Sequence, residues 1–134
     1  MSERVIKLNV QQDLIEARQA VRELARSMGF SLVDQTRVAT AVSEIVRNVF
    51  MFAGEGTCTI SSSRQSDRMT LSIVVEDRGP GIDDISAALQ DGTSSIGSSG
   101  LGMPSAQRLM HTFKVESKVG WGTRVTMTLT RHVP

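Results

Sequence analysis

Residues 71–81 combine an apolar run, an acid and two glycines in an order suited to ligand binding. The β-branched run predicts a buried strand that stops at Asp77, so the sheet would hold this carboxylate rigidly. Gly79 and Gly81 follow in the pattern Asp-x-Gly-x-Gly, and glycines let a ligand approach the backbone without an obstructing Cβ. A fixed carboxylate there suits an amino group such as that of adenine. Taken alone, the pattern is more typical of a strand that ends in a tight turn with a solvated aspartate.

A second pair of polar residues, Glu44 and Asn48, lies one turn apart on a predicted helix. The apolar stripe of this helix, which should face a sheet, consists of Val38, Val42, Ile45, Val49 and Phe52. Asn48 costs about 0.5 kcal/mol relative to alanine inside a helix unless its amide has a use. An amide oxygen suits Mg²⁺, and a carboxylate one turn earlier can orient a hydroxyl for attack on a phosphate. An exposed glutamate and a surface amide are the alternative, which this pattern alone favours.

Glycines and small polar residues dominate the segment 90–102, which predicts either a disordered linker or a binding lid. Its end favours a lid, because Gly100, Leu101 and Gly102 lead through a proline into a helix predicted over 105–110. Glycines before a helix N-terminus expose backbone N–H groups beside the positive end of the helix dipole, where phosphate binds. The segment is neither a Walker A loop nor a Rossmann fingerprint, since no Gly-Lys-Ser/Thr and no βαβ unit accompany it.

The fourth candidate, Thr123, follows a two-glycine turn at 119–122. Apolar and polar residues alternate over 113–117 and 123–129, so these segments predict a hairpin around the turn. The Thr123 hydroxyl is either structural or able to reach a ligand.

The remaining segments alternate between strands and helices in a chain of single-domain size. They predict a strand at 5–10, a helix from about 11–13 to 28 closed by Gly29, strands at 57–63 and 69–76 around a polar turn, and one or two helical turns at 83–89. Asp13 and Asp34 are candidate caps of the two long helices. The strand at 69–76 is the richer in Val and Ile, so we expect it to be central and its partner to lie nearer an edge.

A basic ridge lies on the polar face of the first predicted helix, where Arg18, Arg22 and Arg26 recur at intervals of four. A solvated helix face explains this ridge more simply than a docking surface for an acidic partner does.

Composition narrows the possible functions. A net charge of +1, without a cluster of Lys and Arg, provides no field for nucleic acid. Cys58 is the single cysteine and lies in a strand-like run, so we expect a core residue and no disulfide. His111 and His132 are far apart in the sequence and have no nearby Cys or paired His, so a zinc site is not expected. No apolar run approaches the roughly 20 residues of a membrane span, and we expect a cytoplasmic protein.

The four candidates, in this order, resemble the motifs of the GHKL (Bergerat-fold) ATP-binding family over nearly the whole chain. The helix pair resembles the family's N box, and Asp-x-Gly-x-Gly resembles its G1 box. The end of the predicted lid is similar to the G2 box at Gly97, Gly100, Leu101 and Gly102. The threonine after the late turn matches the family pattern as well.

This resemblance implies ATP and Mg²⁺ as cofactors and a role for each position. Asn48 would bind Mg²⁺, Asp77 would recognise the adenine amino group, and the lid glycines would hold the phosphates. Thr123 would support the adenine pocket, and Glu44 would orient or deprotonate an incoming hydroxyl. The implied fold is one α/β domain over 1–134: a two-layer sandwich with helices on one face of a mixed, mostly antiparallel sheet.

Within the family, the chain resembles the small bacterial serine kinases of partner-switching systems, in particular the switch kinases of stressosomes. The likeness rests on the short length and on the phrases Ala-Val-Ser-Glu-Ile-Val-Arg-Asn and Glu-Asp-Arg-Gly-Pro-Gly-Ile. Anti-sigma kinases look like the next relatives. The resemblance implies phosphorylation of a Ser or Thr on a small STAS-domain protein. A nucleotide-gated binding module, which sequesters or releases a partner, is the alternative. The partner, the oligomeric state and the output, whether a sigma factor, a phosphatase or a cyclase, stay open.

Overall fold

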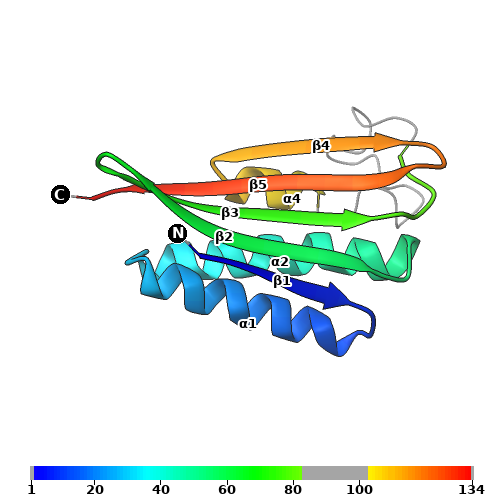
Figure 1. The fold of residues 1–134 in the computed structure, drawn as a ribbon, viewed down its shortest axis with the longest axis horizontal. Helices are drawn as coiled ribbons and strands as arrows, with labels where there is room; N and C mark the ends of the chain where they lie inside the picture. The colour runs from blue at the N-terminus through cyan, green and yellow to red at the C-terminus, as the bar shows by residue number, and fades with distance from the viewer. Residues whose placement is uncertain (1, 83–102, 134) are drawn as a thin grey trace.

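Helices cover one face of a five-stranded sheet in the computed structural model, which describes residues 2–82 and 103–133 (Figure 1). Helix α2 lies between α1 and α4 and contacts both. The helical turns predicted at 83–89 and the lid predicted at 90–102 lie outside the described residues. So do four predicted site residues: Gly97, Gly100, Leu101 and Gly102.

The strands lie in the order β1 (Ser2–Leu8), β2 (Gly56–Gln65), β3 (Arg68–Asp77), β5 (Gly122–His132) and β4 (Thr112–Lys118). Strand β3 is therefore central and β2 lies next to an edge, as predicted. Every neighbouring pair is antiparallel, so this part of the chain contributes none of the parallel pairing that a mixed sheet would have. Two hairpins, β2–β3 and β4–β5, supply most of the sheet, and hairpins are antiparallel by construction.

Both hairpins extend further than their alternation predicted. Strands β2 and β3 stay paired up to Gln65 and Arg68, so only Ser66 and Asp67 form the turn. Ser66 has a φ of 59°, the left-handed conformation that two-residue hairpin turns require. The polar residues around this turn are paired but exposed, which is why their composition alone indicated a longer loop.

The two long helices are α1 (Gln12–Ser27) and α2 (Leu32–Phe52). Ser31 caps α2, since its hydroxyl accepts the N–H of Asp34 at 3.1 Å. Asp34 is thus an acidic residue of the first turn and not the cap. Gly29, with a φ of 83°, closes α1 as predicted.

Asp13 lies inside the first turn of α1 and not at its N-cap position. Its carboxylate reaches back and accepts the N–H groups of Asn9 and Val10, at 2.8 and 2.9 Å. The hydrogen bonds from Val10 and Asn9 lower the pKa of Asp13. The acid therefore fixes the link between β1 and the helix.

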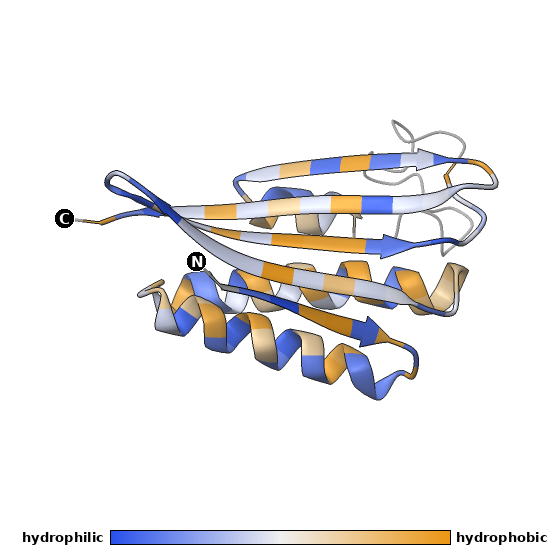
Figure 2. Cartoon of the chain, viewed as in Figure 1, coloured by the Kyte–Doolittle hydropathy of each residue, from blue (hydrophilic) through white to orange (hydrophobic). Residues whose placement is uncertain are grey.

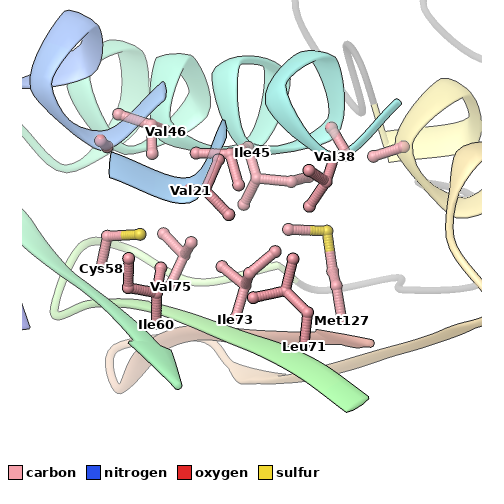
Figure 3. Close-up of a cluster of buried hydrophobic side chains, with 14 of the residues drawn as sticks. Val21, Val38, Ile45, Val46, Cys58, Ile60, Leu71, Ile73, Val75 and Met127 are labelled. Carbon is pink, nitrogen blue, oxygen red and sulfur yellow. The ribbon is translucent and has the colours of Figure 1, made fainter. Parts of the chain in front are cut away.

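The core lies between the helices and the sheet, where apolar stripes of α1 and α2 meet alternate residues of the strands (Figures 2 and 3). Four of the five predicted stripe residues of α2 are buried, whereas Phe52 is 42 % exposed, at the end of the helix where the chain turns away. Val10 is also exposed, because β1 stops pairing at Leu8, opposite the first residue of β2. Cys58 is fully buried, and burial raises the pKa of its thiol to about 12, as expected for a core residue.

The last helix of the described chain is α4 (Met103–Leu109), slightly earlier than predicted. Met103 and Ala106 face the core, and Leu109 and Met110 pack against or within it. This helix begins directly after the predicted lid and packs against α2.

Candidate functional site

One row of cross-strand neighbours brings the polar candidates of the sheet together. Asp77 on β3 pairs with Thr123 on β5, which pairs in turn with Ser117 on β4. On its other side, Asp77 pairs with Gly56 on β2. Val75, two residues before Asp77, is buried beneath the helices, so by alternation this row faces the helices too. Side chains directly opposite in such a row have Cβ atoms about 4.5–5.5 Å apart. The structure thus places Asp77 and Thr123 side by side, and their roles toward a ligand stay predictions.

Asp77 is half-buried at the end of the central strand. Its Oδ1 accepts the backbone N–H of Gly79 at 2.8 Å, which folds the loop back onto the carboxylate. Burial raises the pKa of Asp77, and the backbone N–H groups of Gly79 and Thr123 offset part of this increase. A carboxylate has more acceptor positions than these contacts use, so Asp77 can still accept a ligand amino group.

The glycines of the loop pack against protein. A Cβ placed on Gly79 would lie 2.6 Å from the Cβ of Ala53, at the end of α2. A Cβ on Gly81, whose φ is 82°, would lie 2.1 Å from the carbonyl oxygen of Lys118. Both glycines therefore let the loop approach α2 and the β4–β5 turn closely. Ligand approach through these positions stays a prediction.

Asn48 is a polar residue in the core-facing part of α2, only 8 % exposed. Its amide makes no hydrogen bond with any residue of 2–82 or 103–133. By contrast, Gln35, the other buried amide of this helix, donates its Nε2–H to the carbonyl oxygen of Phe30 at 3.1 Å. No buried side-chain nitrogen or oxygen of the described residues lacks a hydrogen-bond partner, so the unbonded amide of Asn48 keeps some access to solvent and stays open to a ligand.

The last turns of α2 lie directly over the polar row. Val49 comes within 3.0 Å of the position that a Cβ on Gly56 would occupy, and Ala53 touches Gly79 in the same way. Asn48 therefore belongs to the helix segment that covers Asp77 and its neighbours. The two layers of the sandwich meet at one site, with the amide in one layer and the carboxylate in the other.

Glu44 lies one turn before Asn48, and 30 % of its side chain is exposed. Its Oε1 is 3.3 Å from Nη1 of Arg47, an ion pair that sequence reasoning missed although Glu-x-x-Arg is a pairing distance on a helix. The pair holds the carboxylate at the rim of the helix. Glu44 is thus neither fully solvated nor buried, and it stays available to a group that approaches from outside.

Ser117 is the other site residue that sequence reasoning missed. Its hydroxyl accepts the backbone N–H of Ile82 at 2.8 Å, donates to the carbonyl oxygen of Gly122 at 2.6 Å, and lies 3.0 Å from Oγ1 of Thr123. The signal was present in the predicted hairpin, since continuing its register past the two-glycine turn pairs Ser117 with Thr123.

Two surface hollows of about 390 and 430 Å³ meet at Glu76, Asp77 and Arg78. Both are large enough for a small ligand. Asp77 lines both of them and Thr123 lines the second, whereas Asn48 lines neither, so they adjoin the polar row without reaching the amide on α2. The candidate site itself lies where the polar row faces α2.

The described residues contain no group of three or more His, Cys, Asp or Glu that could hold a metal ion together. Mg²⁺ does not need such a cluster, because it keeps several waters and binds substrate phosphates with one or two protein ligands. An amide oxygen like that of Asn48 fits that chemistry. No helix of the described chain is both long and apolar enough to cross a membrane.

The fold and the matching family model together define an ATP-binding domain. The chain belongs to the family of the histidine kinase-like ATPase domain, whose model matches residues 9–129. Serine/threonine-protein kinase RsbT of Bacillus subtilis is 39 % identical over 120 residues, which cover 90 % of both chains. An anti-sigma F factor of Clostridium kluyveri is 33 % identical over 117 residues, which cover 83 % of this chain and 81 % of that protein.

Solved structures share the fold at lower identity. In the crystal structure of the RsbU and RsbW domains of Rv1364c from Mycobacterium tuberculosis, 34 % of that chain matches 99 % of this one with a TM-score of 0.65 and 18 % identity. The SiaB–SiaC complex from Pseudomonas aeruginosa gives a TM-score of 0.57 at 11 % identity, covering 96 % of this chain and 89 % of that one.

These relationships confirm the predicted family, the two-layer fold and the use of ATP. The similarity to RsbT confirms the predicted class of serine/threonine kinase, and anti-sigma factors are related as predicted. The roles of individual site residues, the Mg²⁺ and the STAS-domain partner stay predictions.

Proposed function

We propose that the protein is a cytoplasmic serine/threonine kinase that transfers the γ-phosphoryl group of ATP to a hydroxyl of a small STAS-domain protein in a partner-switching pathway. The observation that carries this proposal is the mostly buried Asn48, whose amide has no hydrogen bond to the described chain, on the helix that covers the half-buried carboxylate of Asp77. The kinship to RsbT supports the class of reaction.

Each side chain has a task in this reaction. Asp77 accepts a hydrogen bond from the adenine amino group, and its fixed position at the end of β3 orients the base. The amide oxygen of Asn48 would hold Mg²⁺, which, when bound, neutralises negative charge on the phosphates. Glu44, at the rim of the same helix, accepts the proton of the incoming hydroxyl or orients it for in-line attack. The predicted lid glycines would hold the phosphates through their backbone N–H groups.

Calorimetric titration with ATP, with and without Mg²⁺, tests the proposal. We expect Asn48→Ala to lose the Mg²⁺-dependent part of the ATP affinity while the protein keeps its melting temperature, because the amide has no protein partner to lose. Gln35→Ala is the matched control. Its amide is hydrogen-bonded, so it should lower the melting temperature and leave ATP affinity unchanged. Absence of any heat at millimolar ATP in the parent protein would rule out the proposed function.

A second candidate function, binding and release of a partner without transfer, has a specific observation in its favour. A groove of about 560 Å³ between α1 and α2 is lined by Arg18, Gln19, Arg22, Ala39, Thr40 and Ser43. Neither Arg18 nor Arg22 has an ion-pair or hydrogen-bond partner in the part of the chain that the structure describes, whereas Arg26 of the same ridge pairs with Glu23. Two unpaired guanidinium groups at one groove fit an acidic segment of a protein partner. Docking there is compatible with kinase activity, because the groove lies apart from Asp77.

A further inference from the structure

We infer that Ser117 fixes the direction of the Thr123 hydroxyl, so that Thr123 presents only a hydrogen-bond acceptor to the nucleotide base and thereby selects adenine. This inference rests on the proposed function, since it concerns the base that binds beside Asp77. It assigns a positioning role to Ser117, a residue on the edge strand β4, and a defined polarity to Thr123.

The inference follows from counting protons at Ser117. A serine hydroxyl has one proton to donate and two lone pairs that accept. The carbonyl oxygen of Gly122 can only accept, so the contact of 2.6 Å takes the single proton of Ser117. The backbone N–H of Ile82 can only donate, so its contact of 2.8 Å takes one lone pair. One lone pair is left for the contact of 3.0 Å with Thr123.

The remaining contact therefore has only one favourable direction. Thr123 must donate its proton to Ser117, because otherwise two oxygen lone pairs would face each other at hydrogen-bond distance. The threonine proton is then committed, and its Oγ1 offers lone pairs alone to anything that binds in the row. Asp77, the cross-strand neighbour of Thr123, also offers an acceptor. The row Asp77–Thr123 thus presents acceptors throughout.

An acceptor-only row discriminates between purines that differ at position 6. The 6-amino group of adenine donates directly to such a row. Hypoxanthine has a carbonyl at position 6, so in the same position two sets of acceptors would face each other. If Thr123 no longer donated its proton to Ser117, its hydroxyl could turn and donate to the carbonyl of hypoxanthine, and part of this penalty would be lost.

The same serine also anchors the loop, because Ile82 lies just after Gly81 and is held to β4 only through this hydroxyl among the described contacts. Loss of the anchor should weaken all nucleotides alike. The ratio of two affinities cancels that uniform effect and isolates the polarity of Thr123.

Calorimetry with ATP and inosine triphosphate measures this ratio. In Ser117→Ala, we expect both affinities to fall and the preference for ATP over inosine triphosphate to narrow by about threefold to tenfold, the range of one hydrogen bond. Ser117→Thr keeps the hydroxyl and should keep the preference. Ser72→Ala, a serine of the opposite sheet face, is the matched control and should change nothing.

A double-mutant cycle separates polarity from general loosening. Thr123→Val should narrow the preference by itself, and Ser117→Ala added to it should narrow it no further. If Ser117→Ala does not fold, the comparison of Thr123→Val with Thr123→Ser decides, because only the valine variant should lose the preference.

Three results would overturn the inference. An unchanged preference in Ser117→Ala, or additive effects in the cycle, would remove Ser117 from base selection while the proposed function stands. A parent protein that binds ATP and inosine triphosphate equally would have the same consequence. A parent that binds neither nucleotide would overturn the proposed function and this inference with it.

Discussion

At the scale of single residues, Asp77 illustrates a conflict between folding and function. Burial raises its pKa, which means that the folded protein disfavours the ionised carboxylate relative to the unfolded chain. A group with a raised pKa in the folded state contributes stability below the unfolded pKa and loses it as pH rises through the folded pKa. At neutral pH the ionised carboxylate therefore lowers the stability of the folded protein, and its proposed role in ligand binding gives a reason for its presence.

We predict that Asp77→Asn raises the melting temperature of the nucleotide-free protein at pH 7 and lowers its affinity for ATP. Asparagine can still accept the N–H of Gly79, so the loop stays folded. The stability gain should shrink as the pH falls toward the ordinary range of an aspartate, where the parent carboxyl is protonated as well. Thermal melts at several pH values and ATP titrations test this. A variant that is less stable than the parent at pH 7 would show that the carboxylate is structural.

Glu44 is the residue predicted to orient or deprotonate the incoming hydroxyl. Glu44→Gln keeps the size of the side chain but removes the base, so we expect ATP binding to persist while transfer to the partner falls by about 10²–10⁴-fold, the usual contribution of general-base help. Radiolabelled ATP and a STAS-domain substrate measure transfer. Glu23→Gln is the matched control, because Glu23 forms the equivalent ion pair with Arg26 on α1. Undiminished transfer in Glu44→Gln would exclude this residue from the mechanism.

At the scale of elements, the site depends on how closely the loop after β3 approaches the turn between β4 and β5. The N–H of Gly120 donates to the carbonyl oxygen of Pro80 at 2.8 Å, and Gly81 lies against Lys118. The loop that carries Asp77 is thus clamped by a hairpin turn about 40 residues later in the chain.

Two glycines with nearly the same φ separate strain from crowding. Gly81 and Gly120 have φ values of 82° and 81°, but a Cβ would collide with Lys118 only at Gly81 and would meet nothing within 4 Å at Gly120. We predict that Gly120→Ala costs about 1–2 kcal/mol of unfolding free energy, the cost of a left-handed alanine. Gly81→Ala should cost a further ~1–3 kcal/mol from overpacking and should weaken ATP binding. Urea titrations measure the difference, and equal costs would mean that the clamp is not tight.

At the scale of the whole molecule, the proposed ATP site and the proposed partner groove occupy separate surfaces. The polar row lies between the α2 layer and one end of the sheet, whereas the groove with Arg18 and Arg22 opens between α1 and α2. Helix α2 contributes to both, through Asn48 at one and Thr40 and Ser43 at the other. A partner docked in the groove would therefore rest on the helix that carries the predicted Mg²⁺ ligand and Glu44.

Charge reversal tests the groove as a docking surface. We predict that the double variant Arg18→Glu, Arg22→Glu weakens partner binding at least about tenfold and makes binding less sensitive to salt. ATP affinity should stay unchanged. Arg18→Glu and Arg37→Glu are matched single variants with the same charge change, and Arg37→Glu should have a much smaller effect because Arg37 is an exposed residue of α2 outside the groove. Surface plasmon resonance with a STAS-domain partner measures both, and equal losses in the two variants would indicate a general charge effect.

Local patterns in the sequence predicted the elements, the family and the candidate residues, and the roles of those residues stay predictions. Helical spacing predicted the buried stripe of α2, alternation predicted both hairpins, and the order of the motifs indicated an ATP-binding domain. Local patterns also explain the errors. Polar composition at 64–68 predicts a five-residue turn, but pairing up to Gln65 and Arg68 leaves only two residues in it. Asp13 favours the helix N-terminus from within the first turn, and its carboxylate reaches back to two residues before the helix.

Which polar groups have a hydrogen-bond partner, and in which direction each hydrogen bond runs, depends on the tertiary structure. The unpaired amide of Asn48 and the paired amide of Gln35 have equivalent sequence signals, and their difference depends on what the fold places beside each. The hydroxyl of Ser117 meets Ile82, 35 residues away along the chain, because β4 and the loop after β3 converge at one end of the sheet. Hydrogen bonds have fixed donors, fixed acceptors and short range, so their direction at a site follows from three-dimensional neighbours that no local pattern specifies.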